Sequence, residues 1–250
     1  MTGSQEVDSS ILFSSTKQFK GLAETLIPFF VFKLDGLMSI CLLTDCRAWH
    51  TGEYISIYEA GQLMSTALLL IDIQKDYFPG GRMELVGSIE AAGAAERLLA
   101  AFRRAAWPVY HIRHISSRPT ASFFLPDTSG IEIYPGVAPL PDEPVITKHY
   151  PNSFRDTDLL ERLKAAGISH LLVCGMMTSM CVDATVRAAF DFGFGCTVAQ
   201  DACATRNLFF AGEDIPASHV HGSFLAALGA VYANIRTTDA ILEGITAADR

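Results

Sequence analysis

Short apolar runs alternate with longer amphipathic segments between residues 66 and 235, and this alternation limits the possible folds more than any other feature. We expect strands at 66–71, 108–112, 145–147, 170–174, 196–199 and 230–235, and helices at 88–105, 158–166, 181–192 and 217–228. The first run, TALLLI, is apolar throughout after its threonine, which is typical of a strand buried on both faces of a parallel sheet. Strands that alternate with helices are joined by right-handed crossovers. The sequence therefore predicts an α/β fold, a three-layer α/β/α sandwich with a mostly parallel, six-stranded, Rossmann-like sheet.

Charge and apolar content exclude several classes of partner. The formal net charge is -8, so the chain has no basic surface to neutralise the phosphates of a nucleic acid or an anionic membrane. The most apolar early stretch, 26–43, is interrupted by Lys33 and Asp35 and falls short of the roughly 20 apolar residues of a membrane span. Glu6 and Asp8 stand where a signal peptide is positive. We expect a cytoplasmic protein with a small-molecule substrate, and with its six cysteines reduced.

The composition changes near residue 64. Alanine supplies 3 of the first 63 residues and 28 of the remaining 187. Strand and helix patterns alternate from Met64 onward, whereas residues 1–63 show no sustained periodicity. We therefore expect 1–63 to be an extension outside the catalytic core and 64–250 to be the catalytic domain, although an oligomerisation or lid segment is an alternative for 1–63.

Three reactive side chains follow three different predicted strands. Asp72 closes the first strand, Lys148 closes the third, and Cys181 follows the fourth after a short turn. Ligands of open α/β sheets bind beyond the carboxyl ends of the strands, so these side chains are expected to meet at one site. The turn after the first strand reads DIQKDYFPGG and lacks the glycine pattern of dinucleotide-binding proteins. The long loop after the second strand is a further candidate for a functional segment.

The segments that carry these residues resemble a known family. LLLIDIQKDYF, VITKHYPNSF and VCGMMTSMCVDATVRAA are similar, in order and spacing, to the three signature segments of the isochorismatase-like cysteine hydrolases. The resemblance implies that Cys181 is the nucleophile, Asp72 its proton acceptor and Lys148 a stabilising cation. A thiol attacks as thiolate, so we expect Lys148, Asp72 and the start of a helix to lower the pKa of Cys181 from about 8.5. Asp76 and Cys203 are the competing residues of the same types.

The resemblance also implies how the transition state is stabilised. A cis peptide bond is expected between Met176 and Met177, directing the amides of Met177 and Cys181 toward the developing oxyanion. Such donors each contribute roughly 3–4 kcal/mol. The implied activity is hydrolysis of an amide- or lactam-type C–N bond through a thioester on Cys181, because the third segment is similar to a subgroup that includes streptothricin-type amide hydrolases. Ser179 departs from that subgroup, which often has histidine there, and this puts the substrate in doubt.

Metal and cofactor sites are not expected. Nicotinamidases of this superfamily carry an Asp-x-His metal motif, where this chain reads HIRHISSRP without a carboxylate. His219 and His221 lie two positions apart in a predicted helix and point to different sides, which makes a poor metal site. We therefore predict no metal and no cofactor, and the sequence disfavours a nicotinamidase.

Residues near the strand ends are candidates for substrate contact, although core packing explains an aromatic side chain equally well. These candidates are Gln74, Tyr77, Phe78, Met83, His114, Phe124, Tyr150, Met177 and Ser179.

Other functions remain open at this point. One alternative is ether hydrolysis of the isochorismatase type, which needs no thiol nucleophile. Another is a non-catalytic scaffold that kept the fold, and a third is a redox-sensing thiol protein with Cys203 as resolving partner. On the resemblance alone we expect a homo-oligomer.

Overall fold

The computed structural model describes residues 29–34, 37–42 and 66–248. Most of the predicted extension, residues 1–63, lies outside these ranges, so its separation from the catalytic part stays a prediction. Within it, β1 (Phe29–Leu34) and β2 (Leu37–Leu42) pair as an antiparallel hairpin. These two strands belong to a different compact unit from the rest of the described chain.

Six strands form one sheet, in which every neighbouring pair is parallel and the order is β10-β7-β6-β3-β4-β5. The strands are β3 (Thr66–Ile71), β4 (Val109–His114), β5 (Val145–Lys148), β6 (His170–Met176), β7 (Gly195–Ala204) and β10 (Asn234–Arg236). The helices are α2 (Ser88–Arg104), α3 (Leu159–Ala165), α4 (Asp183–Asp191), α5 (Ala217–Val231) and α6 (Thr238–Ala248). The predicted six-stranded α/β fold is confirmed.

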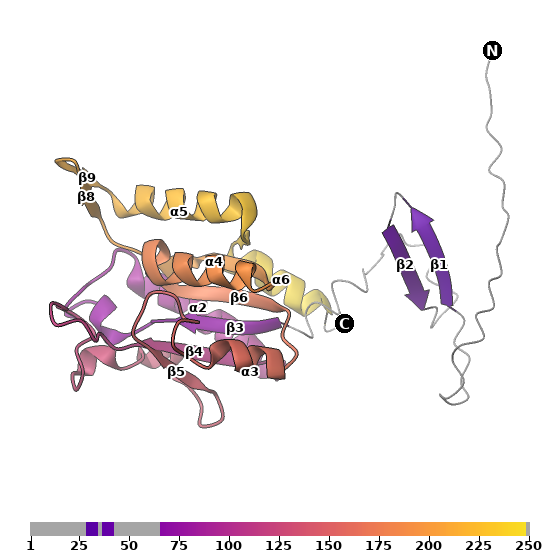
Figure 1. The fold of residues 1–250 in the computed structure, drawn as a ribbon, viewed down its shortest axis with the longest axis horizontal. Coiled ribbons are helices and arrows are strands. Elements are labelled where there is room, and N and C mark those ends of the chain that lie inside the picture. The colour runs from indigo at the N-terminus through magenta and orange to yellow at the C-terminus, as the bar shows by residue number, and fades with distance from the viewer. Residues whose placement is uncertain (1–28, 35–36, 43–65, 249–250) are drawn as a thin grey trace, which may run out of the picture. The chain divides into compact units, whose positions relative to one another are not determined.

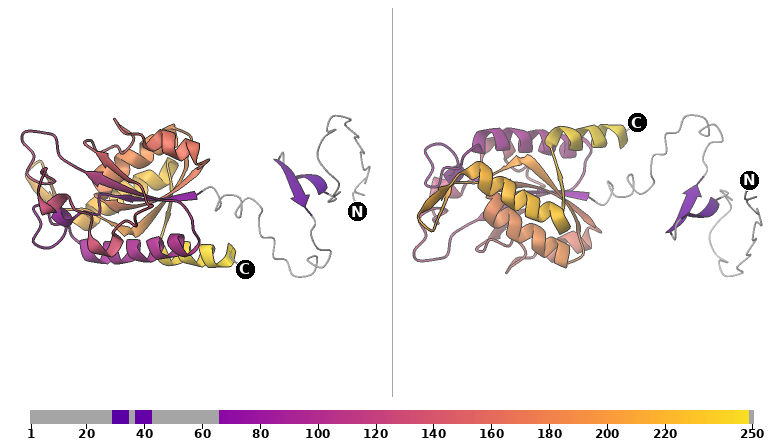
Figure 2. Two further views of the ribbon diagram at one scale, coloured as in Figure 1. Left: turned by 90° about the horizontal axis from the view of Figure 1, so that it is seen from below. Right: turned by 90° about the horizontal axis from the view of Figure 1, so that it is seen from above.

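The central strand β3 explains the three layers (Figure 1). All six of its residues are buried, and successive side chains of a strand point to opposite faces. Leu68 and Leu70 join the core cluster beneath α2 and α6, whereas Leu69 and Ile71 join the cluster beneath α3, α4 and α5. Figure 2 shows α2 and α6 together on one side of the sheet, with α4 and α5 on the other. None of the helices in the described ranges is long and apolar enough to cross a membrane.

Several boundaries differ from the sequence expectation because tertiary contacts extend or shorten elements. Helix α5 continues to Val231, so β10 begins at Asn234 and not at 230. Strand β7 runs on to Ala204, since its last residues pair with the end of β6. The helix expected from Cys181 begins instead as a π-helical turn, Thr178–Val182, followed by α4. The short hairpin of β8 (Leu208–Phe210) and β9 (Glu213–Ile215), and helix α6, were not predicted.

A partly buried ionic network around Glu143 holds the long loop after β4 against the sheet. The Glu143 carboxylate accepts hydrogen bonds from Arg103 Nε (2.8 Å), His111 Nε2 (2.9 Å) and the Leu140 amide (2.9 Å). Its side chain is only 9% exposed. Burial raises the pKa of Glu143, but the hydrogen bonds from Arg103 and Leu140 outweigh burial and lower it to about 2. The carboxylate therefore stabilises the folded chain.

Glu143→Gln is expected to lower the free energy of unfolding at pH 7 by roughly 2 kcal/mol, because the partly buried Arg103 loses its counter-charge. The folded-state pKa lies below the ordinary 4.5, so the stabilisation is complete above that pH and is lost as the pH falls toward about 2. Denaturant unfolding at pH 7 and pH 3 measures this difference. Glu132→Gln, which removes an exposed ion pair with Lys75, is the control and should change little. An equal loss at both pH values for Glu143→Gln would contradict this account.

Candidate active site

Four neighbouring strands place the candidate residues at one edge of the sheet. Asp72 directly follows β3, His114 ends β4, Lys148 ends β5, and the turn carrying Cys181 follows β6. Because β6, β3, β4 and β5 are adjacent in that order, these carboxyl ends meet. Asp72 has a positive φ of 51°, which marks a sharp change of direction where the buried strand stops.

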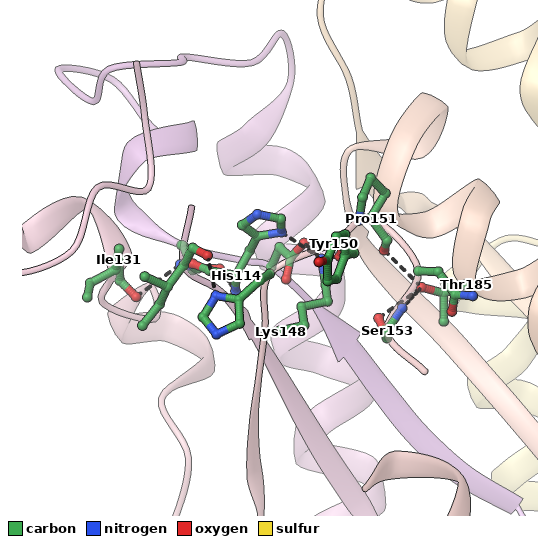
Figure 3. A network of polar contacts seen from close by, with 12 residues as sticks. His114, Ile131, Lys148, Tyr150, Pro151, Ser153 and Thr185 are labelled. Carbon is green, nitrogen blue, oxygen red and sulfur yellow. Dashed lines mark hydrogen bonds and ion pairs between the residues drawn. The ribbon is translucent and has the colours of Figure 1, made fainter. Parts of the chain in front are cut away.

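A buried ion pair forms the centre of the site. Lys148 Nζ lies 2.6 Å from Asp72 Oδ2, and both side chains are fully buried. Lys148 Nζ also lies 3.0 Å from His114 Nδ1 and 3.1 Å from the carbonyl oxygen of Tyr150. Figure 3 shows His114, Lys148 and Tyr150 side by side in this network. The second carboxylate oxygen, Asp72 Oδ1, is buried and has no hydrogen-bond partner among the described residues.

Cys181 lies against this pair. Its side chain is 4% exposed and sits in the π-helical turn that precedes α4. One ligand atom each from Asp72, His114 and Cys181 lies within 4.8 Å of the others. Asp72 Oδ2 is already bound to Lys148, so Oδ1 is the oxygen left to accept a proton from the neighbouring thiol. The structure therefore brings together all three residues that the sequence singled out for chemistry.

The electrostatics of the site correct one expectation. The pKa of the Cys181 thiol is raised, first by burial and then by the negative charge of Asp72, and the opposing charge of Lys148 does not compensate. Burial also raises the pKa of the Asp72 carboxyl, against the charge of Lys148. Burial lowers the pKa of Lys148, but Asp72 and Cys181 outweigh it and the net direction is upward. Burial therefore favours the neutral thiol of Cys181 over the preformed thiolate expected from the sequence.

Backbone contacts fix the turn that carries Cys181. The Met176–Met177 peptide bond is cis. The carbonyl oxygen of Met177 accepts hydrogen bonds from the amides of Met180 (3.0 Å) and Val182 (3.2 Å), which holds Cys181 between them. Gly175, with φ +129°, packs so closely that an added Cβ would lie 2.1 Å from the carbonyl oxygen of Ile71. The oxyanion role of the Met177 and Cys181 amides stays a prediction.

The site does not fit a metal ion. Among the described residues, Asp72, His114 and Cys181 are the set of candidate ligands close enough to share one. However, the Lys148 ammonium already lies within hydrogen-bonding distance of both Asp72 and His114. A divalent ion at this position would meet a buried positive charge, so the donor set favours the chain's own cation.

Three predicted substrate contacts are used by the fold itself. The Gln74 side chain is fully buried, donates to the carbonyl oxygens of His114 (2.9 Å) and Ile131 (3.0 Å), and accepts from the His114 amide (2.7 Å). Phe78 stacks on Tyr134, with ring centroids 3.8 Å apart. Phe124 is fully buried beside Tyr77 and His114. Each of these three residues has its polar groups or its surface occupied within the core, and their contact with substrate stays a prediction.

The remaining candidates for substrate contact differ in burial and in their contacts. Tyr77 and Ser179 are buried, and the Ser179 hydroxyl pairs with that of Thr205 at 2.9 Å. Tyr150 is half-buried and carries the guanidinium of Arg155 over its ring, 3.6 Å from the centroid. His114 is also half-buried. Met83 is partly buried against the core and Met177 is 6% exposed. Substrate contact by these residues stays a prediction.

Two features that support the site could not be predicted from residue type. The Tyr150 carbonyl oxygen binds Lys148, and any residue at that position supplies the same group. The loop that holds it is anchored to α4, because the Thr185 hydroxyl contacts the amide (3.1 Å) and hydroxyl (2.8 Å) of Ser153 (Figure 3). Ser153 and Thr185 are in contact in the fold but lie 32 positions apart in the sequence, so their contact left no signal there.

Comparison with known proteins agrees with this geometry. The family model of the isochorismatase domain matches residues 66–217. YddQ, an uncharacterized isochorismatase family protein of Bacillus subtilis, is 51% identical over 180 residues, which cover 72% of this chain and 100% of that protein. Streptothricin hydrolase of Streptomyces noursei is 37% identical over 155 residues, covering 61% of this chain and 51% of that enzyme. A solved isochorismatase-type structure from Oleispira antarctica aligns with a TM-score of 0.70 and 48% identity, over 72% of this chain and 97% of the other.

Proposed function

This chain belongs to the isochorismatase family of hydrolases, and we propose that it cleaves an amide-type C–N bond of a small molecule through a thioester on Cys181. The family membership supports hydrolysis in general. The relative named streptothricin hydrolase supports the narrower choice of an amide- or lactam-type bond. A cytoplasmic location and a homo-oligomeric state remain proposals alongside this function.

One observation carries the proposal: the two oxygens of the Asp72 carboxylate have different tasks. Oδ2 holds the Lys148 ammonium at 2.6 Å, whereas Oδ1 is buried without a hydrogen-bond partner, and a carboxylate oxygen of Asp72 lies within 4.8 Å of Cys181 Sγ. An unpaired buried acceptor is costly, roughly 1–3 kcal/mol, and folding alone gives no reason to keep one. An acceptor waiting for the thiol proton explains why it is kept. Ether hydrolysis without a thiol nucleophile leaves this arrangement unused.

The reaction follows from these positions. Asp72 Oδ1 takes the proton from Cys181 while Sγ forms a bond to the carbonyl carbon, and the carbonyl oxygen becomes an oxyanion. The amides of Met177 and Cys181 are the proposed donors to this oxyanion. When the C–N bond breaks, the leaving nitrogen takes the proton from Asp72, and an acyl thioester remains on Cys181.

Hydrolysis of the thioester restores the enzyme. Asp72 accepts a proton from water as the water oxygen attacks the acyl carbon, and the C–S bond then breaks. The proton returns to the Cys181 sulfur and the carboxylic acid leaves. Lys148 stays protonated throughout, since Asp72 and Cys181 hold its pKa above the ordinary value. Its charge offsets the negative charge that moves between sulfur and carboxylate.

A panel of small linear, aromatic and cyclic amides tests the proposal, with amine or ammonia release and carboxylic acid formation as readouts. We expect at least one amide to be hydrolysed by the full chain, and the Cys181→Ala variant to lose at least a thousandfold in kcat. A vinyl ether substrate in the same panel tests the isochorismatase-type alternative. Ether cleavage that survives Cys181→Ala, with no amide hydrolysed, would reject the proposed function.

A further inference from the structure

Three acceptors lie within hydrogen-bonding distance of the Lys148 ammonium. A lysine ammonium has three N–H donors and no acceptor. In this site the three acceptors are Asp72 Oδ2 (2.6 Å), His114 Nδ1 (3.0 Å) and the Tyr150 carbonyl oxygen (3.1 Å). Lys148 itself is fully buried. The position of the ammonium is therefore set by these three acceptors together.

The contact with Lys148 fixes the state of His114. Because lysine only donates, His114 Nδ1 must be the unprotonated ring nitrogen, and the hydrogen of the neutral ring lies on Nε2. The groups that face the ring reinforce this choice. Burial first, and then the positive charges of Lys148, His149 and Arg118, lower the pKa of His114 to about 3. His114 is therefore a neutral acceptor near neutral pH.

The fold holds the His114 ring in place from two sides. Its backbone amide and carbonyl are both bound to the buried Gln74 side chain, at 2.7 and 2.9 Å. Its ring packs on Phe124, with centroids 5.7 Å apart. The Gln74 amide thus uses two of its three hydrogen bonds on the backbone of His114, and the third goes to the carbonyl oxygen of Ile131. A buried, fully bonded side chain of this kind fixes the end of the strand.

We propose that His114 is a positioning residue, whose Nδ1 keeps the Lys148 ammonium on Asp72 Oδ2 and away from Oδ1. This inference rests on the proposed function, since it concerns the same site. Without the His114 acceptor, Lys148 loses one of its hydrogen-bond partners and the ammonium can rotate to bind both carboxylate oxygens. Binding of Oδ1 by Lys148 removes the acceptor for the Cys181 proton. His114 thus acts on the nucleophile through Lys148 and Asp72, without touching the reacting atoms.

Two variants of similar size separate the hydrogen-bonding role of His114 from its packing. In His114→Asn the amide oxygen can replace Nδ1 as acceptor, whereas His114→Leu fills comparable space without one. His149→Asn is the matched control. It removes the exposed neighbouring histidine, which contacts the Ile115 carbonyl oxygen and not Lys148.

The readout is the rate of alkylation of Cys181 by iodoacetamide in the full chain, measured by peptide mass spectrometry between pH 5 and pH 9. We expect His114→Leu to slow alkylation at pH 7 by about tenfold and to shift its pH profile upward. His114→Asn should recover to within about threefold of the native rate, and His149→Asn should match it. A melting curve of each variant shows that the folded chain is being compared.

The outcomes distinguish the two proposals. A native rate and profile in His114→Leu, or equal losses in the Leu and Asn variants, would overturn the positioning role alone. If Cys181 of the native chain reacts no faster than Cys174, Cys196 and Cys203, which are buried thiols with raised pKa values, both the positioning role and the proposed function are overturned.

Discussion

Asp72→Asn is expected to lower kcat by about a thousandfold, the range typical of a general acid–base residue. The asparagine keeps the shape of the side chain and an oxygen for Lys148, but it cannot accept the Cys181 proton at Oδ1. The pKa of Cys181 is raised, so the thiol does not ionise by itself near neutral pH. Because burial raises the pKa of Asp72, native activity should fall with acid at a higher pH than an exposed aspartate would give. Steady-state kinetics against pH measure both effects.

Asp76→Asn is the matched control, because Asp76 is also a buried carboxylate and lies four positions after Asp72. Its oxygens accept hydrogen bonds from the backbone amides of Phe124 (2.6 Å) and Arg82 (3.2 Å). The bond to Phe124 connects the long loop to the turn after β3. We expect this variant to lose stability but to keep kcat within about tenfold for the folded fraction. Loss of activity in Asp76→Asn, with near-native turnover in Asp72→Asn, would show that Asp76 and not Asp72 is the base.

Lys148→Met should cost roughly 3–5 kcal/mol in the free energy of unfolding, as well as most of the activity. The methionine fills the space of the lysine chain but leaves the Asp72 carboxylate fully buried and without a counter-charge. A buried unpaired charge is among the few causes of destabilisation this large. Denaturant unfolding at pH 7 gives the magnitude. A loss below about 1 kcal/mol would mean that the ion pair is hydrated in solution.

The double variant Asp72→Asn/Lys148→Met separates stability from catalysis. Replacing both partners of a buried ion pair by neutral groups of similar volume is often close to neutral. We therefore expect the double variant to recover most of the unfolding free energy lost by Lys148→Met, with a clear coupling between the two sites. Its kcat should stay as low as that of Asp72→Asn. Recovery of activity together with stability would contradict a chemical role for the pair.

The fold could be predicted because its causes are local in the sequence. The apolar run ending at Ile71 and the alanine-rich segment that becomes α2 can each be recognised from their own residues. Asp72, Lys148 and Cys181 could be placed together because each follows a strand, and parallel strands end at the same edge. The end of α5 could not be predicted, since nothing in the sequence near Val231 stops the helix earlier or later.

Within the site, the sequence could not show how polar groups are shared. Gln74 lies in a signature segment and was predicted to contact substrate. Its amide donates hydrogen bonds to the carbonyl oxygens of His114 and Ile131, which lie 40 and 57 positions away. The direction of the Cys181 pKa shift depends on burial as well as on charge, and burial is a property of the folded chain. The acceptor role of His114 depends on a lysine from the next strand, which the residue type alone does not reveal.

The central claim, a covalent thioester on Cys181, is tested most directly by mass spectrometry of the full chain. The enzyme is mixed with an amide that the panel has identified, quenched with acid during turnover, and digested. We predict that the peptide containing Cys181 gains the mass of the acyl group, that the adduct is lost on treatment with hydroxylamine, and that it is absent in Cys181→Ala. Steady turnover with no adduct on Cys181, and with activity retained in Cys181→Ala, would contradict the account.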